Sequence, residues 1–327
     1  MKWIKLGSIA IFLVILILVS RLPLFSPPLR HVQLGFWTEG LYDRASGHVH
    51  PEVLRSLQKE INKKVSIAHF YVGWEDLDQR DFVQNIQTLQ KNGWTPLVSS
   101  NPYFFRDCPA TAQTLYAAIA AGACDTFLHK AGKNLSSINK PFYFVFAWEM
   151  NNNSNQWSIP YTRSNPADFI AAWRHMHTVF ANEQVKNIFW VFDPNVPEDR
   201  LLYKSFYPGD TYVDYFGLDG YNWGATQSWS TWESFADIFT KSYNELVSIN
   251  PHKKIILAEV NTTDEGGDKG AWYNDMLTQQ IPYFFPQMSA IVFYNEDRSV
   301  QEGVNWKVDV NKESLESFIS AIHSAWY

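Results

Sequence analysis

Short apolar runs alternate with stretches of helical periodicity along most of the chain. Eight of these runs are rich in β-branched and aromatic residues, which is typical of buried strands. They lie at 32–37, 65–71, 95–99, 142–147, 187–192, 212–218, 254–258 and 290–294. The pattern predicts a β-strand at each of these places.

Between these runs, polar and apolar residues recur with the spacing of an α-helix. The clearest helical patterns lie at 51–62, 80–92, 166–182, 232–250 and 270–279. Asn165 followed by Pro166 is a fitting helix start, since asparagine caps a helix and proline suits its first position. Asn92 followed by Gly93 is a fitting helix end just before a strand.

This alternation predicts an α/β fold with a parallel sheet covered by helices. Eight such units close naturally into a (β/α)8 barrel, the TIM barrel, which needs roughly 250 residues. An open doubly wound sheet is the competing fold, but it usually carries a glycine-rich phosphate turn after its first strand. The turn from Phe36 to Gly40 has no such motif. We therefore expect one barrel domain over residues 32–327.

The first 31 residues differ from the rest of the chain. Lys2 and Lys5 precede an apolar run at 6–19, which is followed by Ser20 and Arg21. This pattern predicts a segment 1–20 that is either a cleaved signal peptide or an uncleaved membrane anchor. In both cases we expect the barrel to be exported, either secreted or periplasmic, or held at the membrane outside the cytoplasm. Residues 21–31 contain three prolines and indicate an extended tether.

Composition narrows the function classes. The net charge is −6 and no basic block occurs, so nucleic acid is not an expected partner. Aromatic residues make up 16% of the chain, including 14 Trp. They fit either a large aromatic core or a cleft lined with rings on which sugars stack.

Cysteine and histidine usage gives no metal motif. Cys108 and Cys124 are compatible with one disulfide in an oxidising compartment, or with two unpaired thiols. His175 and His177 are two positions apart on a predicted helix and so point to different faces. We expect no metal and no organic cofactor.

Two glutamates end buried strands, where a TIM barrel builds its active site. Glu149 follows the fourth predicted strand and Glu259 follows the seventh. A carboxylate at the end of a buried strand is costly unless it is paired or functional. The two glutamates either form ion pairs at the rim or are the acid and the nucleophile of glycoside hydrolysis.

Other predicted strand ends add polar and aromatic groups, which together resemble a sugar site. They include His69 and Tyr71, Asn101, 193–195, 219–223 and 294–296.

An ordered series of motifs over 32–310 resembles glycoside hydrolase family 26, which includes β-mannanases, mixed-linkage β-glucanases and β-1,3-xylanases. The motifs are Lys140-Pro141, Trp148-Glu149-Met150-Asn151, Ala172-Trp173-Arg174-His175-Met176-His177, Trp190 with Pro194-Asn195, Tyr207-Pro208-Gly209-Asp210, Val213-Asp214, Gly217-Leu218-Asp219-Gly220-Tyr221-Asn222-Trp223, Ala258-Glu259 and Phe293-Tyr294-Asn295-Glu296. Ile119-Ala120-Ala121-Gly122 with Asp125 is also similar to the family.

The resemblance implies a retaining (β/α)8 enzyme in which Glu149 is the general acid/base and Glu259 the nucleophile. It places Tyr221 beside the nucleophile and gives Trp223 and Phe293 or Tyr294 as stacking surfaces. The candidate substrate-binding residues are Tyr221, Trp223, Trp148, His69, Tyr71, Asn101, Asn151, Phe293 and Tyr294.

The chain departs from the family pattern in the sugar-binding positions. Trp148 stands where the family usually has histidine, Val145 where arginine is frequent, and Ser100-Asn101-Pro102 where Trp-Glu-Pro is frequent. The sugar therefore stays open between a β-mannan and a β-glucan type.

We expect a monomeric, endo-acting enzyme with a polysaccharide substrate. The alternatives are a catalytically silent glycan-binding barrel, and an anchored enzyme that trims the cell's own exopolysaccharide. Any membrane contact is expected only through residues 1–20.

Overall fold

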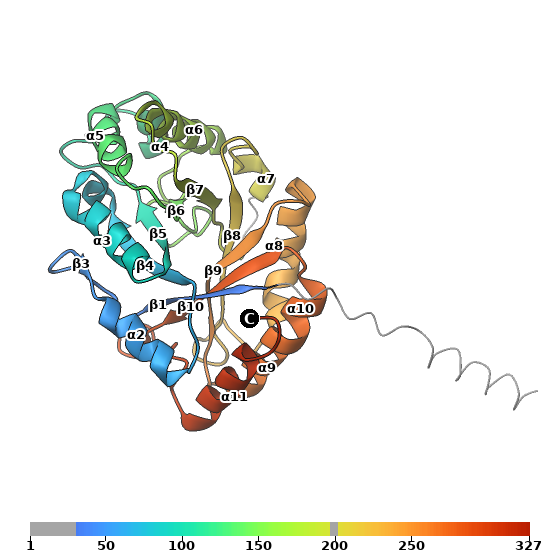
Figure 1. Cartoon of the computed structure of the whole chain (residues 1–327). Coiled ribbons are helices and arrows are strands. Elements are labelled where there is room, and N and C mark those ends of the chain that lie inside the picture. The colour runs from blue at the N-terminus through green and yellow to red at the C-terminus, as the bar shows by residue number, and fades with distance from the viewer. Residues whose placement is uncertain (1–30, 197–201) are drawn as a thin grey trace, which may run out of the picture.

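The computed structural model describes residues 31–196 and 202–327, and these form a closed parallel barrel surrounded by helices (Figure 1). The predicted segment 1–20 and nearly all of the tether 21–31 lie outside the described residues. No helix within the described ranges is long and apolar enough to cross a membrane.

Eight parallel strands close the barrel in the order β1-β10-β9-β8-β7-β6-β5-β4. The strands are β1 (Gln33–Thr38), β4 (Ile67–Gly73), β5 (Thr95–Asn101), β6 (Phe142–Phe146), β7 (Ile188–Phe192), β8 (Tyr215–Asn222), β9 (Ile255–Thr262) and β10 (Met288–Asn295). The prediction of a (β/α)8 barrel is confirmed. β8 and β9 continue past their predicted ends, so Tyr221 and Glu259 lie inside strands.

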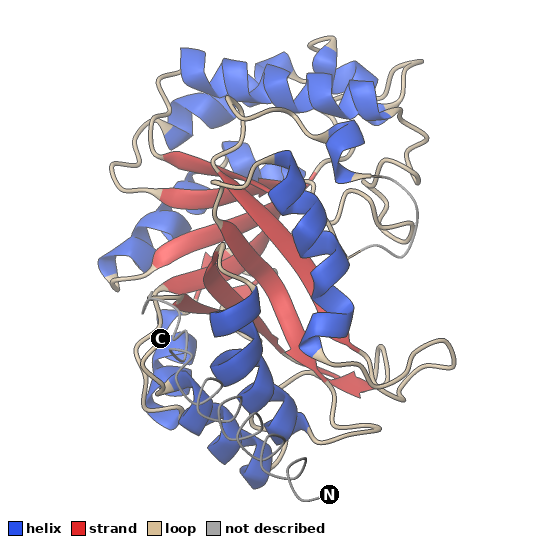
Figure 2. Cartoon of the chain, turned by 90° about the vertical axis from the view of Figure 1, so that its right-hand side faces the viewer, coloured by secondary structure: helices blue, strands red, loops and turns tan. Residues whose placement is uncertain are grey.

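Helices cover the outside of the barrel (Figure 2). They are α2 (Pro51–Glu60), α3 (Arg80–Lys91), α4 (Leu115–Ala120), α5 (Asp125–Leu135), α6 (Pro166–Asn182), α7 (Tyr203–Phe206), α8 (Phe235–Ile249), α9 (Lys269–Asp275), α10 (Ile281–Phe284) and α11 (Lys312–Ile322). A 3₁₀ turn, η1 (Trp74–Asp78), and a π-helical turn, η2 (Met276–Gln280), complete them. Two small antiparallel ribbons pair β2 (Tyr42–Asp43) with β3 (His48–Val49), and β11 (Asp297–Arg298) with β12 (Val304–Asn305).

Capping side chains set the helix starts. The Asn165 side chain accepts a hydrogen bond from the Asp168 backbone at 2.9 Å, which confirms the predicted start of α6. α8 starts at Phe235 rather than at the predicted residue 232, because Ser234 and Asp237 form a capping box there.

Two apolar clusters stabilise the barrel. The larger cluster lies between strands and helices and contains most of the buried aromatic side chains. The smaller cluster fills the interior of the barrel with residues from six of its strands, among them Ile67, Leu97, Val145, Val191, Ile256, Ala258, Ala290 and Val292. The large aromatic content is therefore partly structural.

The cysteines join two segments beside the barrel. Cys108, in the loop after β5, forms a disulfide with Cys124, the residue that precedes α5. Both side chains are fully buried.

Candidate active site

A cavity of about 740 Å³ opens at the C-terminal ends of the barrel strands. Its wall includes Glu149 and Glu259 together with five of the nine predicted substrate-binding residues. Those five are Tyr71, Trp148, Tyr221, Trp223 and Tyr294. This volume is within the range of ligand pockets, which run from about 300 to 1,000 Å³.

A bulge in β9 turns Glu259 toward the cavity. Ile256 and Ala258 both belong to the cluster inside the barrel, so strict alternation would turn Glu259 outward. The pairing of β9 with β8 shifts register between Leu257 and Glu259. This extra residue lets Ala258 and Glu259 face the same side, which is how bulges re-aim side chains.

Glu149 occupies an irregular backbone just after β6. Both Ala147 (φ 57°) and Glu149 (φ 49°) are in the left-handed region, which is costly for residues other than glycine. The Glu149 amide donates to the Asp193 carbonyl at 2.8 Å, and this bond ties the turn to the end of β7. Such strain at a cavity wall is typical of functional sites.

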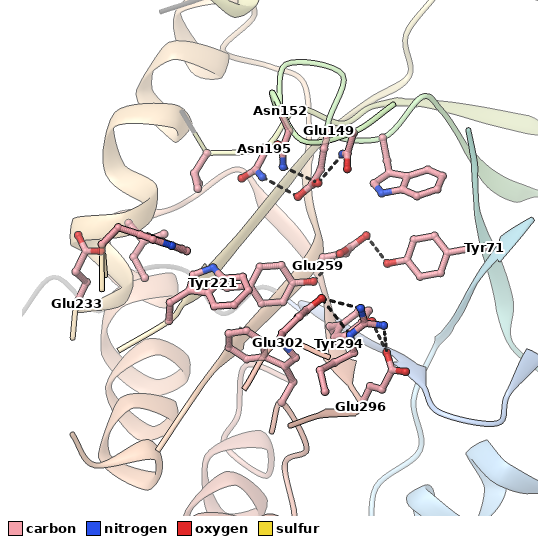
Figure 3. Close-up of a pocket in the computed structure, with 18 of the residues that line it drawn as sticks. Tyr71, Glu149, Asn152, Asn195, Tyr221, Glu233, Glu259, Tyr294, Glu296 and Glu302 are labelled. Atoms are coloured by element: carbon pink, nitrogen blue, oxygen red, sulfur yellow. Dashed lines mark hydrogen bonds and ion pairs between the residues drawn. The ribbon is translucent and has the colours of Figure 1, made fainter. Parts of the chain in front are cut away.

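The two glutamates have different hydrogen-bond partners (Figure 3). Asn195 donates to Glu149 Oε1 at 2.7 Å, and Asn155 and Asn152 donate to Oε2 at 2.9 and 3.2 Å. Glu259 instead accepts from phenols: Tyr71 donates to Oε1, and Tyr221 donates to Oε2 at 2.5 Å. Each carboxyl group is thus held at both oxygens, one by amides and the other by hydroxyl groups.

Burial sets the protonation of Glu259 and its partners. Its side chain is 6% exposed, and burial followed by repulsion from Glu149 raises the pKa of Glu259 to about 8. The two phenol donors oppose this shift because they stabilise the carboxylate. Burial also raises the pKa of Tyr71 and of Tyr221 well above the usual value, so both remain protonated donors.

Two further carboxyl groups lie buried close to the glutamates. Asp193 and Asp219 are fully buried and lie beside each other, with a side-chain hydrogen bond between their two carboxyl groups. Burial raises the pKa of Asp193 and of Asp219 well above the usual value, and the charge of Glu259 adds to both shifts. These groups therefore favour their neutral forms.

Four of the nine predicted substrate-binding residues do not line the cavity. The prediction for Phe293 is wrong, because its ring is fully buried against Phe36 and Phe318 in the core. Tyr294, the other residue named for that role, lines the cavity and stacks on Trp37 at 4.6 Å.

The remaining three support the cavity or lie beside it. His69 is fully buried, bonds Ser99 Oγ at 2.9 Å and packs against the Tyr71 ring at 4.6 Å. Burial lowers the pKa of His69 to about 3, so this side chain is neutral. Asn151 exchanges two hydrogen bonds with the Asn195 backbone. Asn101 ends β5 outside the cavity wall.

Trp148, which departs from the family pattern, is part of an aromatic group. Its ring lies 5.0 Å from Tyr71 and 4.3 Å from Trp157. The Trp157 indole donates to the Trp148 carbonyl at 2.7 Å. The position that usually carries histidine therefore presents an apolar face to the cavity.

Several lining residues were missed by the sequence analysis. Arg298 and Glu302 are among them: they lie 2.7 Å apart and line the cavity, and Arg298 also lies 3.6 Å from Glu296, which the sequence analysis had included. The amide-rich run 151–155 after Glu149 was a usable signal for Asn152 and Asn155. No motif marks Arg298 or Trp306.

Comparison with known proteins shows which family the chain resembles. A model described as Glycosyl hydrolase family 26 matches residues 128–276, which include both glutamates. The match supports glycoside hydrolase family 26 for this part of the chain. Endoglucanase H of Acetivibrio thermocellus is 29% identical over 322 residues, which are 95% of this chain and 33% of that protein. Mannan endo-1,4-beta-mannosidase A and B of Caldalkalibacillus mannanilyticus is 42% identical over 136 residues, which are 41% of this chain and 23% of that protein.

Solved structures agree with this barrel at the level of the fold. A Bacillus subtilis mannanase matches with a TM-score of 0.63 and 17% identity, over 92% of this chain and 87% of that chain. A modular endo-beta-1,4-mannanase from Cellulomonas fimi matches with a TM-score of 0.65 and 13% identity, over 90% and 71% of the two chains. The chain spans about a third or less of the curated relatives' length.

Proposed function

We propose that this chain is an exported, retaining, endo-acting glycoside hydrolase that cuts a β-linked polysaccharide of the mannan or glucan type. The observation that carries the proposal is the pair of glutamates on one cavity, with Glu149 held by amides and Glu259 held by phenols. The names of the curated relatives, an endoglucanase and a mannan endo-1,4-beta-mannosidase, support a polysaccharide substrate.

The proposed reaction has two steps. In the first step a Glu259 oxygen attacks the anomeric carbon, and Glu149 gives its proton to the glycosidic oxygen as the C–O bond breaks. In the second step Glu149 takes a proton from water, and the resulting hydroxide displaces Glu259 from the sugar. One water is consumed, and two inversions leave the configuration unchanged.

The electrostatics of the pair fit this division of roles. Repulsion from Glu149 raises the pKa of Glu259 only while Glu149 is ionised. With a proton on Glu149, the two phenol donors favour an ionised Glu259, which is the state that attacks. The productive state therefore holds one proton between the two carboxyl groups.

A reducing-sugar assay tests this function. The full chain, in mild detergent, is incubated with galactomannan, mixed-linkage β-glucan, β-1,3-xylan and cellulose. We expect cleavage of at least one polymer, lowered by at least about 10³-fold in Glu259→Gln and in Glu149→Gln, since each change removes a reacting group. Glu316→Gln, the same change on the exposed face of α11, is the matched control and should keep full activity.

The assay also separates the alternatives. Near-normal cleavage by Glu259→Gln contradicts the assignment of the nucleophile. A chain that cuts none of the polymers but binds one of them is a glycan-binding barrel.

A further inference from the structure

One exposed tryptophan at the cavity wall is not used by the proposed reaction. Trp229 is 67% exposed, although it lines the same cavity as Glu149 and Glu259. It is the most exposed tryptophan in the described part of the chain. A large apolar ring that faces a ligand cavity is a natural contact for an apolar ligand face.

A chain of ring contacts leads from the nucleophile to Trp229. Tyr221, which donates to Glu259, lies 4.9 Å from Trp306, and Trp306 lies 4.9 Å from Trp223. The Trp223 ring is in turn 5.5 Å from the Trp229 ring. Trp229 is thus the outermost member of an aromatic series that begins at the reacting carboxylate.

The loop that carries Trp229 is held at several points. Ser230 Oγ donates to the Gly224 carbonyl at 2.7 Å, and the Ala225 amide donates to the Glu265 carbonyl at 2.9 Å. The Gln227 side chain donates to the Glu302 carbonyl at 2.7 Å, which joins this loop to the β11–β12 ribbon. The exposed ring therefore stands on a braced segment of backbone.

Polar groups suited to sugar hydroxyls accompany the ring. Glu233 and Lys241 line the same cavity and are both exposed. Figure 3 shows Glu233 on the opposite side of Glu259 from Tyr71. An apolar face beside exposed donors and acceptors matches a pyranose ring, which has apolar C–H faces and a polar edge.

We propose that Trp229 is the platform of a distal subsite that binds a sugar unit of the polysaccharide away from the cleaved bond. This inference rests on the proposed function, because it takes the ligand of the cavity to be a β-linked glycan. The proposal makes binding depend on chain length, because only sugar units away from the cleaved bond contact Trp229.

The test compares binding and hydrolysis of the full chain with and without Trp229. Affinity gel electrophoresis in galactomannan, mixed-linkage β-glucan and β-1,3-xylan measures binding in the Glu259→Gln background. We expect Trp229→Ala to weaken retention by about tenfold, the loss typical of an aromatic binding residue. Phe284→Ala is the matched control, since Phe284 is 69% exposed on α10, outside the cavity.

Hydrolysis completes the test. In the active background, Trp229→Ala should lower polymer cleavage and leave hydrolysis of dinitrophenyl β-cellobioside and β-mannobioside unchanged. If Trp229→Ala and its Glu259→Gln parent are retained equally, the platform is contradicted. It is also contradicted if none of the three polymers retains the parent. Loss of aryl-disaccharide hydrolysis places the effect of Trp229 at the reacting carbon and also overturns it.

The two proposals fail separately. Trp229-dependent retention without any cleavage by the active chain contradicts the hydrolase and keeps the platform. Cleavage with unchanged retention in Trp229→Ala keeps the hydrolase and contradicts the platform.

Discussion

Individual side chains give the two glutamates their different environments. The sequence analysis identified Glu149, Glu259 and five of the aromatic lining residues, because strand ends and family motifs mark their positions. It placed His69 and Phe293 in the sugar site, although both are fully buried. The direction of a side chain near a strand end depends on local backbone geometry, which neighbouring residue types do not specify.

Removal of one phenol donor should change the pH dependence of the reaction. The Tyr221 hydroxyl stabilises the Glu259 carboxylate and so lowers its pKa against the effect of burial. Tyr221→Phe should therefore raise the pKa of Glu259, shift the acidic limb of kcat/KM to higher pH and lower kcat by roughly 10–100-fold. The pH profile on the polymer cut in the panel checks this.

Tyr283→Phe is the matched control, since Tyr283 is an exposed tyrosine on α10. An acidic limb that stays in place in Tyr221→Phe, or moves to lower pH, contradicts the role of this donor.

At the scale of elements, the barrel strands and main helices followed from apolar runs and capping residues. The eight strands and the start of α6 were predicted, whereas α4, α5, α7, α10 and α11 were not. Of these, α4, α7 and α10 have four to six residues, too short for a clear period. The bulge in β9 and the left-handed turn at Glu149 were also missed, because no glycine or proline marks them.

The Cys108–Cys124 disulfide should stabilise the segment between β5 and α5. It closes a loop with a sequence separation of 16. Because a loop of this length restricts the unfolded chain, the disulfide should contribute about 3 kcal/mol to the free energy of unfolding. The double variant Cys108→Ala, Cys124→Ala should lower the free energy of unfolding by about this amount. Polymer cleavage should persist, because neither cysteine lines the cavity.

Urea unfolding followed by tryptophan fluorescence measures this loss. Wild-type chain unfolded with a reductant serves as the control and should match the double variant. An unchanged midpoint in the double variant would show that the disulfide does not restrict the unfolded chain.

At the scale of the whole molecule, a common barrel brings together residues that are far apart in sequence. Glu149 follows β6 and Glu259 lies on β9, three strands away around the closed sheet. Tyr71 on β4 and Tyr221 on β8 reach Glu259 from two sides. Barrel topology therefore explains how motifs spread over the chain build one cavity, and this much followed from the sequence.

The sequence did not predict which loops contact each other around the opening of the cavity. The contact of Gln227 with the Glu302 carbonyl and the ring series from Tyr221 to Trp229 join segments with no shared motif. These contacts depend on loop conformations that a single sequence does not specify. They also shape the cavity wall around Trp229.

Covalent trapping of the nucleophile tests the central claim most directly. Glu149→Gln lacks the base of the second step, but a dinitrophenyl leaving group needs no acid in the first step. Incubated with dinitrophenyl 2-deoxy-2-fluoro-β-cellobioside and the corresponding mannobioside, this variant should therefore accumulate a glycosyl-enzyme. Peptide mass spectrometry should locate the added glycosyl group on Glu259, whereas a glycosyl group on another residue, or release of dinitrophenol with no adduct, would contradict the account.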